Sequence, residues 1–212
     1  RTCLVGSEMC IRDSIISEVY PSELSMAANA HALARYAALA QEAGMVPIVE
    51  PEVLMDGKHS AKDCFNKTSE VIKRCYDELD INKVDLKGTI LKPNMILPGT
   101  DSNETISNNE VAEMTLECLK NNVPSEVPGV AFLSGGQTEV EATNNLNQIN
   151  VKNDSSFIMT YSYGRALQQS ALKFWSKDIN NIKGTQEVFD HRAKMCTLAA
   201  QGKWSESLEN SK

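Results

Sequence analysis

The chain has 212 residues, a formal net charge of −7 and a hydrophobic content of 42%. This size and composition predict one globular domain with a single core. The acidic balance argues against nucleic acid as a partner. No stretch approaches the roughly 20 consecutive apolar residues that a membrane helix needs, so we expect no membrane partner either.

The cysteines and histidines indicate neither a disulfide framework nor a metal site. The six cysteines form no CxxC pair, which favours reduced thiols in a cytosolic protein. His31, His59 and His191 are far apart in the sequence and lack the spacing of metal ligands. We therefore expect no metal site.

The pattern of apolar residues predicts helices and strands in alternation. The expected helices cover 21–43, 60–80, 107–121, 138–149, 165–175 and 185–201. The expected strands are MVPIVE (45–50), GTILK (88–92), GVAFLS (129–134) and FIMTYS (157–162). Gly44 follows the first helix as a C-cap, and Ser107 with Glu110 forms a capping box. This alternation predicts a parallel sheet with right-handed crossovers, either doubly wound or part of a (β/α)8 barrel.

Residues that can take part in catalysis or ligand binding follow these strands, and their position favours a barrel over a doubly wound sheet. MVPIVE ends at Glu50, GTILK ends at Lys92, and FIMTYSYGR reaches Arg165. GVAFLSGG runs into Ser134 and two glycines. Barrel enzymes gather their active site at the carboxyl ends of the strands. These four strands are then expected to be the last four of eight.

Lys92 at the end of an apolar strand suggests covalent chemistry. Desolvation disfavours the ammonium form of a lysine, and a neutral amine can attack a carbonyl to form a Schiff base. Glu50 and Glu52 face the same side of an extended backbone, and a carboxylate beside the lysine can shuttle protons. The alternative is a lysine whose side chain extends into solvent and has no chemical role.

The last two strand ends suggest a phosphate site. The LSGG stretch offers backbone N–H groups near a helix start, where glycines allow a ligand to approach closely. Arg165 follows Gly164 at the start of the next helix, and a guanidinium can bind phosphate through two hydrogen bonds. An arginine opposes the dipole at a helix N-terminus, and such local conflicts gather at functional sites.

Taken together, VPIVEPE, GTILKPNMILPG, VAFLSGGQ and SYGRALQ resemble the motifs of class I fructose-bisphosphate aldolases, in the same order, and the likeness covers about residues 15–204. The resemblance implies a (β/α)8 barrel, present here as its C-terminal half with about four β/α units. It also implies a cytoplasmic homotetramer that needs no metal or cofactor. Such enzymes cleave fructose 1,6-bisphosphate into dihydroxyacetone phosphate and glyceraldehyde 3-phosphate.

The resemblance also implies roles for individual residues. Lys92 matches the lysine that forms the Schiff base, and Glu50 matches the acid/base glutamate. The residues that match the binding site for a substrate phosphate are Leu133, Ser134, Gly135, Gly136, Gly164 and Arg165.

Both ends of the chain depart from the family. Residues 1–14, RTCLVGSEMCIRDS, do not resemble it, and we interpret them as a translated sequencing-adapter scar. In the family a mobile tail covers the site and ends in a tyrosine, whereas residues 205–212 here end in Lys212. A full barrel takes ~250 residues, so we expect a fragment that is inactive alone. The alternatives are a related Schiff-base barrel enzyme that acts on another sugar phosphate, and a non-catalytic piece of an oligomer.

Overall fold

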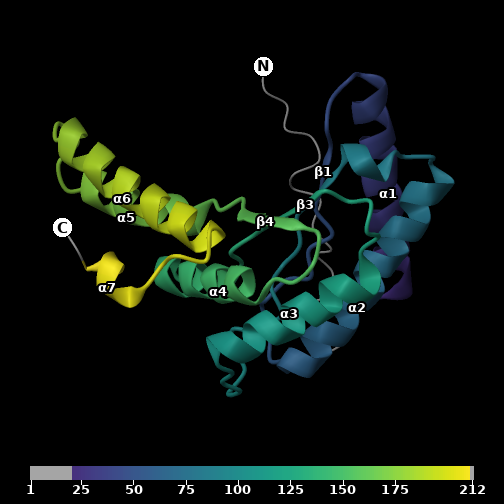
Figure 1. The fold of residues 1–212 in the computed structure, drawn as a ribbon, viewed down its shortest axis with the longest axis horizontal. Coiled ribbons are helices and arrows are strands. Elements are labelled where there is room, and N and C mark those ends of the chain that lie inside the picture. The colour runs from purple at the N-terminus through teal and green to yellow at the C-terminus, as the bar shows by residue number, and fades with distance from the viewer. Residues whose placement is uncertain (1–20, 211–212) are drawn as a thin grey trace.

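The computed structural model describes residues 21–210, whose four strands form one parallel sheet (Figure 1). The strands are β1 (Ile48–Val49), β2 (Ile90–Leu91), β3 (Gly129–Phe132) and β4 (Ile158–Tyr161). The helices are α1 (Glu23–Glu42), α2 (Ala61–Ile81), α3 (Asn108–Asn122), α4 (Glu139–Lys152), α5 (Arg165–Trp175), α6 (Ile182–Ala200) and α7 (Glu206–Glu209), with a 3-10 turn at Leu86–Gly88. The segment 1–14 and the last two residues of the tail lie outside the described residues.

The strand order distinguishes the two sheet architectures that the sequence left open. Each strand pairs with the next one in the chain, in the order β1-β2-β3-β4. A doubly wound sheet instead reverses its direction of growth and carries helices on both faces. In Figure 1, α1 to α4 follow an arc along one side of the strands. Successive β/α units of a barrel wall have this arrangement, which confirms the expected partial (β/α)8 barrel of about four units.

Local sequence signals explain where most helices begin and end. Three helices begin with a capping box: Ser60 with Asp63 at α2, Ser107 with Glu110 at α3, and Thr138 with Glu141 at α4. The predicted box at Ser107 is therefore confirmed. Gly44 has a φ of +73° directly after α1, as its predicted capping role requires. The short α7 was not predicted.

Strands β1 and β2 are shorter than the sequence predicts. We expected them to run to Glu50 and Lys92, but each has two residues in the ladder. Pro47, Pro51 and Pro93 flank them, and a proline has no N–H to donate. The extended path nevertheless continues, because the Lys92 N–H donates to the carbonyl of Val49 at 2.7 Å.

Alternate strand residues face opposite sides of the sheet. The residues that pack toward the helices form the core, and from the strands they include Val49, Leu91, Val130, Phe132 and Met159. The pairing register places the next residue along each chain in one row on the other face: Glu50, Lys92, Ala131 and Thr160. The candidate site begins with this row.

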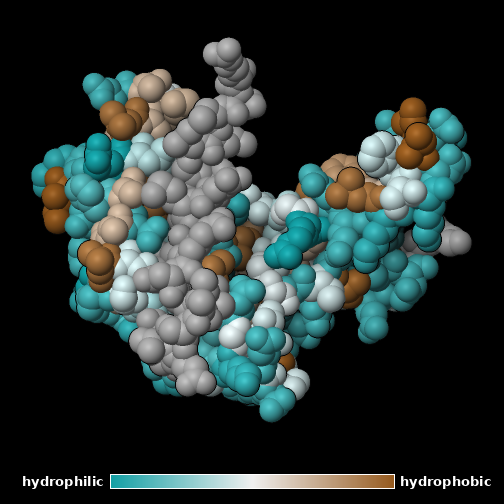
Figure 2. Space-filling view, turned by 180° about the vertical axis from the view of Figure 1, so that it is seen from behind, coloured by the Kyte–Doolittle hydropathy of each residue, from teal (hydrophilic) through white to brown (hydrophobic). Residues whose placement is uncertain are grey.

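The surface far from the sheet carries an exposed apolar tip. Figure 2 shows hydrophobic side chains at the outer end of the α5–α6 pair, where Ile179 is 63% exposed and Ile182 is 62% exposed.

Within 21–210, none of the helices combines the length and the apolar character that crossing a membrane requires.

Candidate active site

Glu50 and Lys92 form a buried ion pair at the carboxyl ends of β1 and β2. Val49 pairs with Leu91 in the sheet, so the residues that follow them lie side by side. The distance from Lys92 Nζ to Glu50 Oε1 is 2.9 Å, and the two side chains are 14% and 5% exposed. The two residues that the sequence singled out for covalent chemistry are thus in direct contact.

Backbone hydrogen bonds between neighbouring loops hold this end of the sheet together. The Leu133 N–H donates to the carbonyl of Pro93 at 3.1 Å, and the Ser162 N–H donates to that of Phe132 at 2.8 Å. These bonds continue the strand order past the ends of the strands. The loop after each strand is therefore fixed relative to the loop after the previous one.

Parts of the predicted phosphate site meet at one cavity. Its volume is about 360 Å³, and its wall includes Gly135, Gly136 and Arg165 together with Glu52 and Gln169. The glycines follow β3 and the arginine opens α5, so the fold brings two distant motifs together. Other predicted residues do not line this cavity, namely Glu50, Lys92, Leu133, Ser134 and Gly164.

The two glycines of this wall are closely packed, and at Gly136 the packing and the backbone conformation together require a glycine. Gly136 has a φ of +75°, and a Cβ there would lie 2.8 Å from the Cβ of Met55. A Cβ on Gly135 would lie 3.3 Å from Glu52 Oε1. Across 21–210, no backbone hydrogen bond uses the N–H of either glycine. No main-chain carbonyl therefore competes for these amides, which can donate to an anion.

Arg165 supplies the positive charge of the cavity. It is exposed at the first position of α5, whose N-cap is Gly164. Gly164 has no side chain to cap the helix, so this helix start has no side-chain cap bond. A guanidinium and the N–H groups of a helix start can together bind a phosphate.

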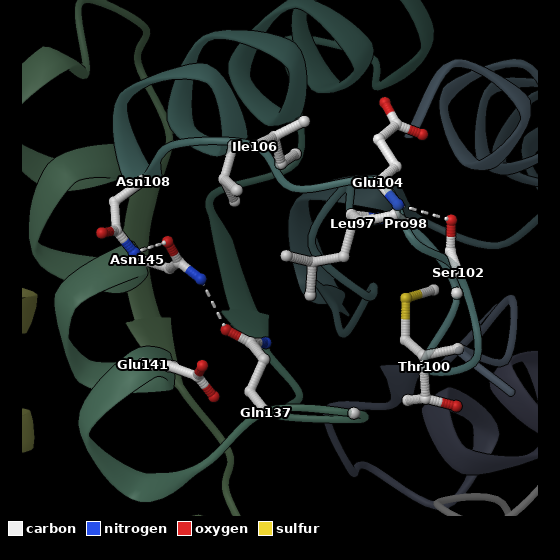
Figure 3. A pocket seen from close by; sticks show the side chains of 14 residues that line it. Leu97, Pro98, Thr100, Ser102, Glu104, Ile106, Asn108, Gln137, Glu141 and Asn145 are labelled. Atoms are coloured by element: carbon white, nitrogen blue, oxygen red, sulfur yellow. Dashed lines mark hydrogen bonds between the residues drawn. The ribbon is translucent and has the colours of Figure 1, made fainter. Parts of the chain in front are cut away.

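Figure 3 shows a chain of amides that reaches Gln137, the residue that follows the two glycines of the loop. Asn108 Nδ2 donates to Asn145 Oδ1 at 2.6 Å, and Asn145 Nδ2 donates to Gln137 Oε1 at 2.8 Å. These residues line a second hollow of about 270 Å³, which shares Gly136 and Gln137 with the cavity around Arg165. Gln137 was not predicted as a site residue, although the SGGQ motif contains it.

The described cysteines are poor alternatives to Lys92 as nucleophiles. Cys64, Cys75, Cys118 and Cys196 are all buried. Burial raises the pKa of Cys75 to about 12 and that of Cys118 to about 11. The reactive thiolate forms are therefore disfavoured at neutral pH. No group of three or more His, Cys, Asp or Glu residues in the described part of the chain could hold a metal ion.

Comparisons with known proteins agree with this arrangement. The family model "Fructose-bisphosphate aldolase class-I" matches residues 11–212. A probable class 1 fructose-bisphosphate aldolase of Xylella fastidiosa (strain 9a5c) is 48% identical over 190 residues, which are 89% of this chain and 57% of that protein. The cytosolic fructose-bisphosphate aldolase 4 of Arabidopsis thaliana is 49% identical over 183 residues, which are 86% of this chain and 47% of that one.

A solved structure shares the fold. The fructose-bisphosphate aldolase of Plasmodium falciparum, crystallised with TRAP and a small-molecule inhibitor, superposes with a TM-score of 0.85 at 42% identity. The match covers 88% of this chain and 54% of that chain. The chain thus spans about half the length of the relatives it matches and corresponds to their C-terminal portion. The sequence, the fold and the strand-end residues agree, and the chain belongs to the class-I fructose-bisphosphate aldolase family.

Proposed function

We propose that this chain supplies the Schiff-base half of a fructose 1,6-bisphosphate aldolase. Lys92 forms an iminium with the ketone of the substrate, and the products are dihydroxyacetone phosphate and glyceraldehyde 3-phosphate. The contact that carries the proposal is the 2.9 Å ion pair between Lys92 Nζ and Glu50 Oε1, buried next to the loops that follow β1 and β2.

Glu50 controls the proton that Lys92 must lose before it can attack. The ammonium proton passes to Glu50 and leaves a neutral amine, whose lone pair adds to the ketone carbon. A proton moves from that nitrogen to the former carbonyl oxygen, which gives a neutral carbinolamine. The Glu50 carboxyl then protonates the hydroxyl, which leaves as water while the C=N bond forms.

The iminium then accepts electrons from the neighbouring carbon–carbon bond. The Glu50 carboxylate takes the hydroxyl proton of the carbon beyond that bond. The bond breaks, the aldehyde leaves, and an enamine stays on Lys92. The enamine carbon takes the proton back, and water hydrolyses the iminium to release the ketone.

The phosphoryl groups are the part of the substrate that the cavity recognises. We assign one phosphate to the loop of Leu133, Ser134, Gly135 and Gly136 and to the start of α5 at Gly164 and Arg165. The glycine N–H groups, which donate to no main-chain carbonyl, and the exposed guanidinium support this assignment. Within this group, the buried Leu133 N–H already donates to Pro93, so Leu133 contributes by fixing the start of the loop.

Further expectations for the parent protein follow from the family. We propose a cytoplasmic enzyme that forms a homotetramer, with a sugar phosphate as its ligand and without metal or cofactor. We also propose that residues 1–14 are not part of the natural coding sequence and that 15–204 form the barrel portion. If the gene encodes residues 1–14 in one continuous stretch with the rest of the chain, the proposal that these residues are not natural coding sequence is wrong.

Borohydride trapping tests the covalent step. Two samples are used: the 212-residue chain, and a chimera in which residues 21–210 replace the matching segment of the Xylella fastidiosa relative. Each is incubated with dihydroxyacetone phosphate and reduced, and the modified peptide is identified by mass spectrometry. We expect a reduced adduct on Lys92 in the chimera, and cleavage of fructose 1,6-bisphosphate by the chimera only. An active chimera with no adduct on Lys92 would overturn the proposal.

The half-length match favours one second candidate for the isolated chain. Because it spans about half of its relatives, the 212-residue chain alone is a candidate for a folded but non-catalytic piece of an assembly. A soluble, folded chain that neither cleaves substrate nor forms an adduct would support that candidate.

A further inference from the structure

We propose that Asn94 is a positioning residue that sets the geometry of the Glu50–Lys92 pair. This inference rests on the proposed function, because it concerns how the two reacting groups are held together. Asn94 is 2% exposed and lies two residues after Lys92, with Pro93 between them. Its side chain is therefore out of reach of solvent and acts on the protein itself.

The Asn94 amide connects both loops that carry the pair. Oδ1 accepts a hydrogen bond from the Val53 N–H at 3.0 Å, three residues beyond Glu50. Nδ2 donates to Thr68 Oγ1 on α2 at 3.1 Å and to the Met95 carbonyl, also at 3.1 Å. One side chain thus ties the loop after β1, the loop after β2 and the helix between them.

This link follows the point where a proline interrupts the main-chain ladder. In a parallel ladder every second residue donates, and here Ile90 donates to Pro47 and Lys92 donates to Val49. On the β1 side the next donor after Val49 would be residue 51, which is Pro51 and has no N–H. Val53, the donor after that, bonds the Asn94 side chain instead of a main-chain carbonyl.

The consequence concerns catalysis as well as stability. Glu50 lies between the last ladder bond and the Val53–Asn94 bond, and Lys92 lies on the opposite segment. If the Asn94 link is lost, the Lys92–Val49 bond is the main-chain bond that remains next to the pair, and the other main-chain bonds between the two loops lie further along them, from residues 99–101 to residues 55–59. A small separation would lengthen the 2.9 Å path along which the proton moves. Misplacement of reacting groups by 1 Å can lower a rate by about 100-fold.

The test compares Asn94→Leu, Thr68→Val and Thr68→Ser in the chimera. Leu has the branched shape and the number of side-chain heavy atoms of Asn, but it is larger and forms no hydrogen bonds, and Ser keeps the hydroxyl that Thr68 offers. We expect kcat of the folded fraction to fall about 10- to 100-fold in Asn94→Leu. The rate of iminium trapping falls in parallel and KM changes little, because the phosphate loop is untouched. Thr68→Val shows the same pattern more weakly, and Thr68→Ser restores the rate.

Asn147→Leu is the matched control. Asn147 is also buried, and its Oδ1 accepts the Trp204 N–H at 3.0 Å, but it lies on α4 away from the strand ends. We expect it to lose stability without a change in kcat. If Asn94→Leu behaves like this control, the proposal is overturned. If Asn94→Leu does not fold, Thr68→Val is compared with the control instead, and an unchanged kcat in Thr68→Val overturns the proposal. A missing adduct on Lys92 in the unsubstituted chimera would instead refute the proposed function.

Discussion

Two buried ion pairs of this fold have similar burial and different chemistry. Lys92 and Glu50 lie at the strand ends, with side chains 14% and 5% exposed. Arg192 on α6 and Glu209 on α7 lie in the helical layer, with side chains 5% and 14% exposed. Burial alone therefore does not mark a residue as reactive.

The partners explain the difference. Arg192 contacts Glu209 through both terminal nitrogens and also donates to Thr143 Oγ1 at 2.9 Å, while Trp204 Nε1 donates to Glu209 at 3.0 Å. A guanidinium cannot be deprotonated in a protein, so this pair can only hold α6, α7 and α4 together. A lysine can give up its proton and then act as a nucleophile. The Lys92 pair can do chemistry because it contains a removable proton.

The substitution Lys92→Met tests this difference most severely. It removes the proposed nucleophile while keeping a side chain of similar length, so we expect cleavage by the chimera to fall by about 10⁴-fold or more. Borohydride should then trap no adduct. Lys177→Met, at an exposed position just after α5, is the control and should leave the rate unchanged. Cleavage that survives in Lys92→Met would contradict the assignment of the nucleophile.

Glu50→Gln tests the proton transfer separately from the nucleophile. The amide keeps the shape of the carboxylate but cannot accept the ammonium proton, so we expect kcat to fall by about 10²–10³-fold. The adduct on Lys92 should still form, but slowly. The measurement is kcat at saturating fructose 1,6-bisphosphate, with Glu117→Gln on α3 as the control. An unchanged rate of iminium formation would assign the proton transfer to another group.

Glu209→Gln tests the ion pair between Arg192 and Glu209. It leaves the buried Arg192 without its counter-charge, and breaking a buried pair in this way costs about 3–5 kcal/mol. We expect a lower urea midpoint in the chimera and an unchanged kcat. Asp80→Asn removes the exposed pair with Lys83, whose side chains are 84% and 81% exposed, and should change the midpoint far less. A loss of kcat with unchanged stability in Glu209→Gln would place this pair in the catalytic machinery.

Two glycines with the same backbone conformation test what the phosphate loop requires. Gly44 and Gly136 have φ values of +73° and +75°, but a Cβ on Gly44 would have no atom within 4 Å. Gly44→Ala should therefore cost only the left-handed penalty, about 1–2 kcal/mol. Gly136→Ala adds the clash with Met55, so we expect a larger loss of stability and a higher KM. Equal losses and an unchanged KM would show that the loop tolerates a side chain.

Sequence periodicity predicted the elements better than their contacts. Capping residues and apolar spacing act within one element, so six helices were predicted with ends within three residues of those observed. The first two strands were overestimated, because the apolar pattern includes or adjoins prolines, which have no N–H to donate to the ladder: Pro47 and Pro51 flank β1 and Pro93 follows Lys92. The sheet order required the structure, because a doubly wound sheet and a barrel have the same alternation of elements.

The residues of the candidate site were also predicted better than the contacts between them. Glu50, Lys92 and Arg165 were found because each follows a strand, and the phosphate assignment came from whole-motif resemblance. The link from Asn94 to Val53 and Thr68 could not be predicted, because it depends on how two loops and a helix pack in space. The Arg192–Glu209 pair was missed for the same reason, since no spacing rule joins residues on separate helices.

The exposed ion pair between Lys152 and Glu113 completes the comparison with the smallest expected effect. It joins α4 to α3 at 3.0 Å, and the hydrogen bond from Lys152 holds the pKa of Glu113 below its ordinary value of 4.5. A lowered carboxylate pKa adds stability above that ordinary value, and this stability is lost as the pH falls through the lowered pKa. We therefore expect Glu113→Gln to reduce the urea midpoint slightly at neutral pH. The difference should disappear in acid, and it should shrink in high salt because the pair is exposed. Glu117→Gln on the same helix is the control. A Glu113→Gln difference that persists in acid would mean that packing, not charge, joins these helices.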